Sequence, residues 1–459
     1  MRKLRRLRGV IIRLMVLAIS VPVLSACVDS MDFSWTPGGC GLEEYELLPI
    51  EDVGAVLSTH QDDLSPLPPE GVDALLEQLT DELSPVPYGA RVYRIRYSTQ
   101  DRGRLEEATG IVSVPWLEEG VTERFPIVLW LHGTTGFNGE CAPSRLGGEH
   151  LLANYLLSAL GYIVVAPDFI GLDGEVELGE PQPVYHAYLN IEQTAVGSWD
   201  LVRAARSFFR SAPEINVRAS NEVALWGGSQ GGHAAFSCDL LQPFYAPEYD
   251  IQASIALIPP TDLFGQARWA LSDVVPTTAA MAAFFKTQQR WYGQTVPLKD
   301  VFVPQLVPKI YDAMYFGCNP AEAFSDVRDV SDAFRSETIR AVLEEDREAL
   351  DRWACFIERN SLTETPVPRM NETPTLMVLG ENDRLVYTPV EQEAFDTLCE
   401  KGYNLEYLEC ADAGHTDAAG WSFMEQIDWL DARMSGVPID EAKQCVRSSP
   451  VRCSGQPEG

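Results

Sequence analysis

Short runs of apolar, largely β-branched residues alternate with longer amphipathic stretches along most of this chain. We expect strands at residues 126–131, 162–166, 222–226, 251–258, 375–379 and 405–408. Helical patterns occupy residues 149–160, 191–210, 230–241, 389–401 and 420–434. Strands that are apolar on both faces need helices on both sides, and helical crossovers make neighbouring strands parallel. The pattern therefore predicts an α/β fold with a mostly parallel sheet flanked by helices.

Two segments depart from this alternation. Residues 91–98 and 107–114 flank a polar turn, which predicts an antiparallel hairpin at a sheet edge. Over a hundred residues separate the strands predicted at 251–258 and 375–379, far more than a strand-to-helix connection needs. We expect this insertion to be helical and, because ligands bind beyond the carboxyl ends of parallel strands, to form a lid or cap. Any single aromatic residue in it fits a small core of its own equally well.

The most specific motif is Gly227-Gly228-Ser229-Gln230-Gly231, which has the form G-x-S-x-G between a predicted strand and a predicted helix. A nucleophile on such a tight turn needs neighbours without side chains, and the glycines supply them. Ser229 would then protrude beside a helix N-terminus, where developing negative charge is stabilised. We predict that Ser229 is a nucleophile.

A serine hydroxyl needs a base to accept its proton. The chain has six histidines, and His415 is the one that follows the last predicted strand and precedes the last predicted helix. His233 is expected to point down the helix that follows Ser229 and to have a packing or capping role. The other four precede the nucleophile: His60, His132, His150 and His186.

The base in turn needs a carboxylate that orients it. Asp383 lies just beyond the strand predicted at residues 375–379, and Glu381 in the same turn is the alternative. Asp412 and Asp417 are interpreted as solvated loop charges. Serine, acid and histidine then follow the chain order that α/β hydrolases use for their triad.

A tetrahedral oxyanion needs hydrogen-bond donors, usually two backbone amides. We predict that one is the amide of Gln230, directly after the nucleophile. The second is assigned to Thr134, in the loop that follows the strand predicted at residues 126–131. The alternative for this loop is a plain glycine-rich turn.

Several motifs together resemble the secretory lipase family of the α/β-hydrolase fold, of the lipase A type. They are His132-Gly133-Thr134-Thr135-Gly136, Cys141-Ala142-Pro143-Ser144, the runs at residues 165–171 and 200–206, and the turn at Ser229. The resemblance extends from about residue 90 to 435. It implies Ser229, Asp383 and His415 as the triad, cleavage of acyl esters, and a large helical lid between the sixth and seventh strands.

Three alternatives to a lipase stay open. The serine turn and the His-Gly loop are shared by esterases, lipases and some peptidases, so they indicate the mechanism better than the substrate. A peptidase and an esterase that trims polymers therefore remain possible readings. A catalytically inactive surface binding protein on the same fold is the alternative from another class.

The N-terminus has the three parts of a secretory signal, with basic residues, a short apolar run and small residues at its end. The sequence Leu24-Ser25-Ala26-Cys27 resembles the lipobox of bacterial lipoproteins. We expect residues 1–26 to be removed and Cys27 to be lipidated, which anchors the chain to a membrane without spanning it. The expected location is the cell envelope, at the outer membrane or cell surface. The alternative is an ordinary signal with an incidental cysteine.

Export implies an oxidising compartment for the remaining nine cysteines. The number is odd, and we expect Cys238 to stay free because it falls within a predicted helix. Neighbour pairing suggests these disulfides: Cys318–Cys355, Cys399–Cys410, Cys445–Cys453 and Cys40–Cys141. We predict no metal site, because the sequence has no cysteine or histidine cluster with zinc spacing. The predicted chemistry needs no cofactor.

The charge balance excludes one class of partner. The chain has 35 Lys and Arg against 67 Asp and Glu, a formal net charge of −32, which argues against nucleic-acid binding. We expect these parts: a signal peptide at 1–26, a tether and irregular N-terminal arm at 27–87, the first part of the core at 88–260, the cap at 261–372, the second part of the core at 373–436, and a cysteine-containing tail at 437–459.

Overall fold

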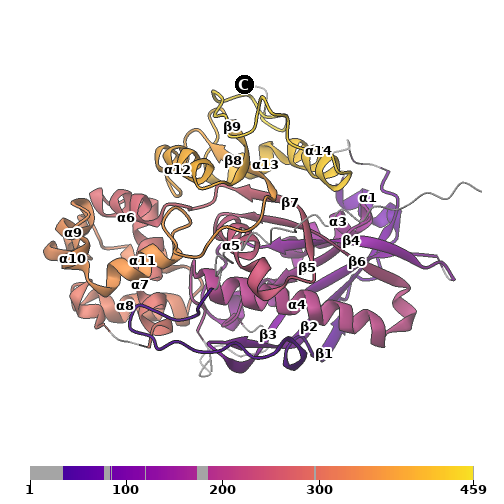
Figure 1. Cartoon of the computed structure of the whole chain (residues 1–459), viewed down its shortest axis with the longest axis horizontal. Coiled ribbons are helices and arrows are strands. Elements are labelled where there is room, and N and C mark those ends of the chain that lie inside the picture. Colours follow the sequence, from indigo (N-terminus) through magenta and orange to yellow (C-terminus); the bar gives the residue numbers. More distant parts are fainter. Residues whose placement is uncertain are drawn as a thin grey trace, which may run out of the picture. The chain divides into compact units, whose positions relative to one another are not determined.

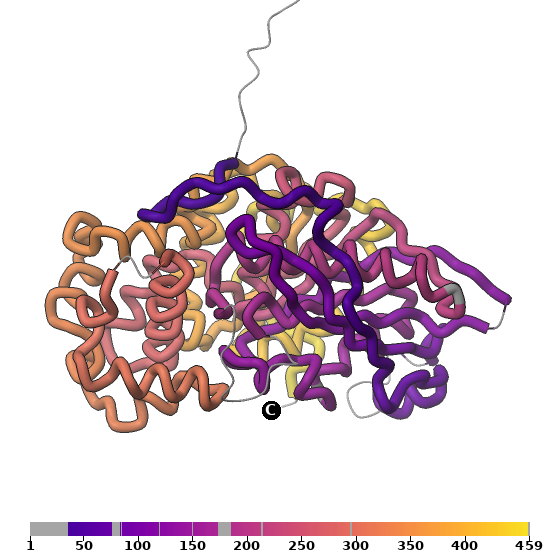
Figure 2. The backbone as a smooth tube through the Cα atoms, turned by 90° about the horizontal axis from the view of Figure 1, so that it is seen from below, coloured from indigo at the N-terminus to yellow at the C-terminus, as the bar shows by residue number. Residues whose placement is uncertain are grey.

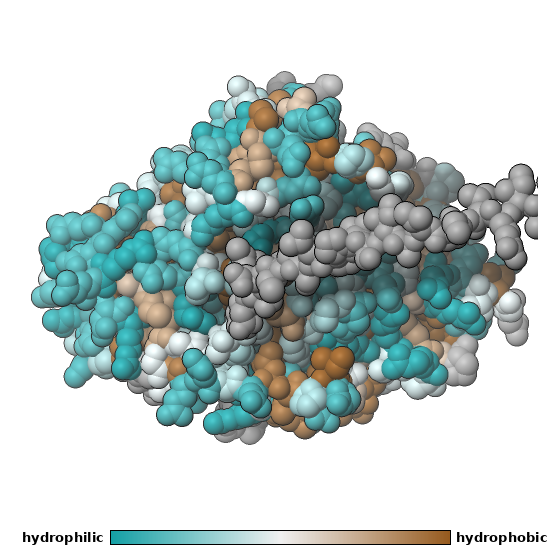
Figure 3. All heavy atoms as spheres, in the orientation of Figure 1, coloured by the Kyte–Doolittle hydropathy of each residue, from teal (hydrophilic) through white to brown (hydrophobic). Residues whose placement is uncertain are grey.

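The computed structural model describes residues 35–76, 83, 85–118, 120–172, 185–293 and 296–457. The predicted signal segment and Cys27 lie outside these residues. Across the described ranges, no helix is both long enough and apolar enough to cross a membrane. Figure 3 shows one face of the molecule, on which hydrophilic side chains predominate and apolar atoms form scattered patches.

The described part of the chain contains a nine-stranded sheet in the order β1-β2-β3-β5-β4-β6-β7-β8-β9 (Figure 1). The strands are β1 (Val56–Gln61), β2 (Gly89–Asp101), β3 (Arg104–Trp116), β4 (Glu123–Leu131), β5 (Ile163–Pro167), β6 (Val217–Gly228), β7 (Asp250–Leu257), β8 (Pro374–Gly380) and β9 (Asn404–Cys410). The strands from β5 to β9 in this order pair in parallel, whereas β1, β2, β3 and β5 pair antiparallel. The predicted hairpin and parallel strands are confirmed, but the hairpin is not at the sheet edge, because β1 pairs with the outer side of β2.

Helices cover both faces of the sheet, as the doubly apolar strands require. The side chains of β4 alternate between the two faces: Ile127 and Leu129 pack in one core cluster, and Val128 packs in another. The first cluster includes residues of α4 (Ile191–Ser211), α5 (Gln230–Tyr245) and α12 (Thr388–Glu400). The opposite face is covered by α3 (Leu152–Ala159), α13 (His415–Trp421) and α14 (Phe423–Met434).

The long insertion between β7 and β8 is helical, as predicted, and we call residues 261–372 the cap. Its helices are α6 (Leu263–Ser272), α7 (Pro276–Trp291), α8 (Leu306–Tyr315), α9 (Ser336–Leu343), α10 (Arg347–Leu350) and α11 (Arg352–Asn360), with short 3-10 turns η5 (Leu298–Asp300), η6 (Pro320–Phe324) and η7 (Val330–Asp332). Most of its aromatic residues form its own core, where Phe285 meets Trp353 edge to face at 5.4 Å. The salmon and orange elements of Figure 1 show the cap beside the sheet.

The N-terminal segment is more ordered than the sequence indicates. In place of an irregular arm, it contains a 3-10 turn η1 (Ile50–Asp52), strand β1 and helix α1 (Pro69–Leu76). Strand β1 is almost wholly exposed, so it carries no apolar alternation that would reveal it; it joins the sheet through backbone pairing with β2. The additional strand also places the cap between the seventh and eighth strands. Figure 2 shows this segment in indigo along the outside of the later elements.

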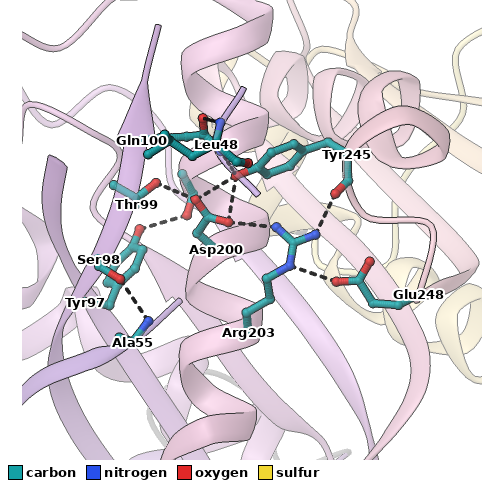
Figure 4. A network of polar contacts seen from close by, with 11 residues as sticks. Leu48, Ala55, Tyr97, Ser98, Thr99, Gln100, Asp200, Arg203, Tyr245 and Glu248 are labelled. Atoms are coloured by element: carbon teal, nitrogen blue, oxygen red, sulfur yellow. Dashed lines mark hydrogen bonds and ion pairs between the residues drawn. The ribbon is translucent and has the colours of Figure 1, made fainter. Parts of the chain in front are cut away.

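A buried polar network fastens this segment to the core (Figure 4). Asp200 of α4 accepts hydrogen bonds from Thr99 Oγ1 at 2.8 Å, from Tyr245 OH at 2.9 Å and from Arg203 Nη1 at 2.7 Å. Next to it, the amide side chain of Gln100 accepts from the backbone N–H of Leu48 and donates to its carbonyl, at 2.6 and 3.2 Å. Asp200 and Arg203 of the run at 200–206 therefore have a structural role at this place.

Four disulfides link distant parts of the described chain: Cys40–Cys355, Cys141–Cys318, Cys399–Cys445 and Cys410–Cys453. All four pairs predicted from sequence neighbours are wrong, whereas the free, buried Cys238 is confirmed.

The β9 region shows the reason for the mispairing. Cys399 is the second-last residue of α12, which precedes the amino end of β9, and Cys410 is the last residue of the strand. Seven strand residues span about 20 Å, whereas the Cα atoms of a disulfide lie about 5.5 Å apart. The C-terminal tail runs beside β9 and brings a cysteine to each of its ends.

Candidate active site

Ser229 lies on a sharp turn between β6 and α5. Its backbone has φ 57° and ψ −119°, a conformation that residues other than glycine rarely adopt. The turn is held by its N–H, which donates to the carbonyl of Leu257 at 2.8 Å. A Cβ atom on Gly231 would collide with the carbonyl oxygen of Leu131, which explains the glycine two residues after the serine.

His415 and Asp383 form a hydrogen-bonded pair. Nδ1 of His415, the first residue of α13, lies 2.6 Å from Oδ2 of Asp383, which follows β8. The other carboxylate oxygen of Asp383 accepts the backbone N–H groups of Leu385 and Val386, at 2.8 and 3.1 Å. Asp383 is buried, and each of its two carboxylate oxygens has a hydrogen-bond partner within the protein. This arrangement makes Nδ1 the donor and leaves the Nε2 lone pair of the neutral ring for another partner.

Ser229 and His415 line one cavity of about 1060 Å³, and Thr134 lines it as well. Most of the other lining residues are apolar. Those from the cap include Leu263, Pro276, Ala279, Ala280 and Met281. Those from the sheet and its flanking helices include Ile111, Trp130, Leu257, Ile258 and Phe423. Three predicted site residues, Ser229, His415 and Thr134, thus line one cavity whose other walls are mostly apolar.

The two predicted oxyanion donors lie at the start of α5 and in the loop after β4. Gln230 is the first residue of α5, where a helix leaves its N–H groups without an intrahelical acceptor. Thr134 follows Gly133, on which a Cβ atom would lie 3.8 Å from Cβ of Ser229. Within the described ranges, neither the backbone N–H of Gln230 nor that of Thr134 donates to another protein group. Both amides are therefore available to a ligand beside Ser229.

The loop that carries Thr134 is held by polar contacts of His132 and Asp168. Nδ1 of His132 lies 2.6 Å from the carbonyl oxygen of Gly133, and its Nε2 lies 3.2 Å from that of Asp168. Burial lowers the pKa of His132 to about 4. The buried carboxylate of Asp168 accepts the N–H of Ser144 at 2.8 Å. These contacts link three of the motifs on which the family resemblance depends.

The other histidines have different places. Nε2 of His186 lies 2.6 Å from Nε2 of Gln230, and burial lowers its pKa to about 3. His233 is packed inside the molecule, as predicted, with Nε2 at 2.8 Å from the carbonyl oxygen of Asn360, and burial lowers its pKa to about 4. His150 lines the cavity, and His60 is exposed on β1.

The alternative acids brace the loop that precedes α13. Glu381 is exposed and accepts the N–H of Asp412 at 2.8 Å. Asp417 accepts the N–H of Gly414 at 3.0 Å at the start of α13. Neither Glu381 nor Asp417 has a hydrogen bond to the His415 ring, whereas Asp383 does.

Sequence reasoning missed a clamp between the cap and the loop that carries Asp383. Gln266 of α6 accepts the N–H of Tyr387 at 3.0 Å and donates to Glu391 of α12 at 2.8 Å. Glu391 also accepts the N–H of Thr261 at 2.9 Å, and burial raises its pKa to about 7. These residues are more than a hundred positions apart, and no local pattern links them. Gln266 lines the cavity, so the clamp reaches the candidate site.

Across the described residues, no group of three or more histidine, cysteine or acidic side chains could hold a metal ion.

Comparison with known sequences gives two matches. The family described as "Secretory lipase" matches residues 144–442 of this chain. Lipase 10 of Candida albicans is 24% identical over 301 residues, in a match that covers 64% of this chain. The chain spans 60% of the length of that lipase.

Comparison with solved structures gives the fold. The rice cell wall degrading esterase LipA from Xanthomonas oryzae superposes with a TM-score of 0.64 at 20% identity, covering 84% of this chain and 96% of that one. A putative hydrolase from Legionella pneumophila gives 0.66 at 21% identity, over 84% and 100% of the two chains. Candida antarctica lipase A in its closed state gives 0.61 at 13% identity, over 92% and 89%. These likenesses confirm the predicted α/β-hydrolase fold.

Proposed function

The chain belongs to the secretory lipase family, and from this premise we propose that it is a serine hydrolase that cleaves carboxylic esters through an acyl-enzyme. One observation carries the proposal: His415, whose ring is hydrogen-bonded to the buried Asp383, lines the same cavity as Ser229 on its strained turn. A strained nucleophile and an oriented base at one cavity are the parts that acyl transfer requires.

In the acylation step, Oγ of Ser229 attacks the ester carbonyl carbon while Nε2 of His415 takes the hydroxyl proton. Asp383 keeps the imidazole in the required tautomer and stabilises the imidazolium that forms. The tetrahedral intermediate then collapses, the bond to the alcohol oxygen breaks, and His415 gives its proton to that oxygen. The alcohol leaves, and the acyl group stays on Ser229.

In the deacylation step, a water molecule enters the position that the alcohol has left. His415 takes one of its protons while the water oxygen attacks the acyl carbon. Collapse of the second tetrahedral intermediate breaks the bond to Oγ of Ser229, and His415 returns the proton to that oxygen. The carboxylic acid is released, and the free enzyme is restored.

Each tetrahedral intermediate carries a negatively charged oxygen, and the backbone N–H groups of Gln230 and Thr134 donate hydrogen bonds to it. Both donors are fixed before the reaction, one by the start of α5 and one by the loop after β4, so they need no reorganisation when charge develops. Neither N–H group donates to another protein group within the described ranges, and this supports the assignment.

The apolar lining of the cavity supports a fatty ester, such as an acylglycerol, as the substrate. Each buried methylene contributes about 0.8 kcal/mol to binding, so a long acyl chain gains more from such a cavity than an acetyl group does. The cap at residues 261–372 provides much of this lining, and we propose that it acts as a lid and sets which acyl chains fit.

Hydrolysis of p-nitrophenyl esters of graded acyl length tests the proposal, with the matching p-nitroanilides as amide substrates. We expect kcat/KM to rise with acyl length and Ser229→Ala to lose more than about 10³-fold of the rate. Ser435→Ala, at an exposed serine after α14, is the matched control and should keep the full rate. Equal rates in the Ser229→Ala variant and the original chain would contradict the mechanism. Faster turnover of the amides than of the esters would indicate a peptidase.

We also propose that the chain is exported and attached to the cell envelope through a lipid on Cys27, with residues 1–26 removed. The four disulfides support an oxidising compartment. Cys27→Ser should move the protein from the membrane fraction to the aqueous fraction. Unchanged partition of this variant would contradict the anchor.

A further inference from the structure

The hydroxyl of Thr134 has a partner that the mechanism above does not use. Its Oγ1 lies 2.9 Å from the phenolic oxygen of Tyr188, which precedes α4. Both residues line the cavity that Ser229 lines, Thr134 as an exposed residue and Tyr188 at 6% exposure. The pair thus joins a largely buried hydroxyl to one that is open to the cavity.

The direction of this hydrogen bond follows from the burial of Tyr188. Within the described ranges, its hydroxyl has no other hydrogen-bond partner than Thr134. If Thr134 donated, the phenolic proton would have no acceptor among the described protein groups, which costs the desolvation of that group. Burial raises the pKa of Tyr188, so its hydroxyl carries its proton at neutral pH. Tyr188 therefore donates, and Oγ1 of Thr134 accepts.

An oxygen that accepts from Tyr188 keeps its own proton for another acceptor. On Thr134 that proton is on a side chain open to the cavity, next to Gly133, whose Cβ position lies 3.8 Å from Cβ of Ser229. We propose that the Thr134 hydroxyl is a third donor to the oxyanion and that Tyr188 is a positioning residue that orders its proton. The inference rests on the proposed ester hydrolysis.

Tyr188 is itself fixed by the cap. Its N–H donates to Oγ1 of Thr287 at 3.1 Å, and its carbonyl accepts Nε2 of Gln288 at 2.7 Å, both on α7. Its ring meets that of Phe137 edge to face, with centroids 5.5 Å apart. The same residue therefore contacts a cap helix through its backbone and the oxyanion loop through its hydroxyl. The cap thereby sets the geometry of the site as well as the shape of the cavity.

The Thr134 hydroxyl itself transfers no proton. As Ser229 attacks, the π electrons of the ester carbonyl move to its oxygen, and the Thr134 hydroxyl donates a hydrogen bond to that oxygen beside the two amides. When the intermediate collapses, the electrons return to re-form the carbonyl, and the Thr134 proton stays on Oγ1. Donation from Tyr188 withdraws electron density from Oγ1 and strengthens the second hydrogen bond.

Three substitutions test this assignment, each assayed with a p-nitrophenyl ester. Thr134→Val removes the hydroxyl and keeps the amide, and we expect kcat to fall about 10²-fold with KM little changed, as for loss of one oxyanion donor. Thr134→Ser keeps a hydroxyl and should recover most of the rate. Tyr188→Phe removes the ordering donor and should lower kcat about fivefold.

Thr135→Val is the matched control, because Oγ1 of Thr135 is buried and has no partner within the described residues. It should leave kcat unchanged. A trifluoromethyl ketone, which forms a tetrahedral adduct with an active serine, provides a second readout. Its affinity should fall in Thr134→Val by the same factor as kcat/KM.

Two results would overturn the inference. Equal kcat in Thr134→Val and Thr135→Val would show that the hydroxyl does not act in the transition state. An effect of Thr134→Val on KM alone would show that it contacts only the bound ester. Failure of the proposed function is a separate result, because Ser229→Ala would then keep the activity of the original chain.

Discussion

Oδ2 of Asp383 lies 2.6 Å from Nδ1 of His415, and its other oxygen is held by two backbone N–H groups of its own turn. The carboxylate is therefore fixed before it meets the imidazole. Glu381, two residues earlier, is exposed and holds the next loop. One short turn thus contains two acids in different environments.

Asp383→Asn tests the role of the first acid. The amide would favour the wrong imidazole tautomer, and we expect kcat to fall about 10³- to 10⁴-fold while the fold is kept. Ester hydrolysis at saturating substrate measures the effect, and circular dichroism checks the fold. Glu381→Gln is the control in the same turn and should stay within about twofold of the original kcat, since surface changes are usually small. Comparable losses in the two variants would contradict the assignment of Asp383.

Gly231→Ala tests the packing behind the nucleophile. The new methyl group would collide with the backbone carbonyl of Leu131, which cannot move without disturbing β4. We expect a loss of about 3 kcal/mol in the free energy of unfolding, measured by denaturant titration. Gly228→Ala is the control within the same motif, because its methyl group would lie 3.7 Å from the Leu257 side chain, an ordinary contact. Equal stability of the two variants would disprove the steric account.

His186 makes stability depend on pH. Its Nδ1 donates to the carbonyl of Ile170 at 3.3 Å, and its Nε2 accepts from the Gln230 amide, so the neutral ring fits. Burial lowers its pKa from 6.5 to about 3, so the folded chain binds this proton less tightly than the unfolded chain. The contribution of the neutral His186 ring to the free energy of unfolding is fully present above about pH 6.5. It is lost as the pH falls toward 3, by up to about 1.4 kcal/mol per pH unit.

His186→Gln can make both hydrogen bonds without titrating, so the slope of stability against pH should decrease in this variant. Denaturant unfolding at about pH 7.5 and about pH 5 measures the slope. His60→Gln, at the exposed histidine of β1, should leave the slope unchanged. A slope in His186→Gln as steep as in the original chain would contradict the prediction.

The disulfide Cys141–Cys318 joins the segment after the Thr134 loop to the cap across 177 positions, and Cys318 lines the cavity. A double replacement of both cysteines by alanine should lower the free energy of unfolding by about 2–5 kcal/mol. Because the bond holds the cap against the site, kcat/KM should fall as well. The double alanine variant of Cys399 and Cys445, far from the cavity in the C-terminal part, should lose stability and keep kcat/KM. Equal kcat/KM losses in both variants would contradict a local role of the first bond.

Much of the sheet could be predicted from the sequence because buried parallel strands must be apolar on both faces. The same holds for the turn at Ser229, where steric crowding demands glycines at fixed positions. The pairing of Asp383 with His415 followed from chain order, since both lie after neighbouring strands at the carboxyl edge of the sheet.

Other features left no local pattern. Strand β1 is exposed and joins the sheet by backbone pairing, so no apolar alternation marks it. The disulfides depend on which loops meet in space, and the tail that runs beside β9 separates sequence neighbours such as Cys399 and Cys410. Tyr188 and Gln266 act through contacts with residues far along the chain. Such positions emerge only from the packed structure.

Labelling with a fluorophosphonate, followed by mapping of the modified peptide, tests the central claim most directly. The reagent reacts with a serine that a neighbouring base has activated. We predict a single adduct on Ser229, absent in Ser229→Ala and formed far more slowly in His415→Gln. No adduct on the folded chain, or an adduct on a different residue, would contradict the account.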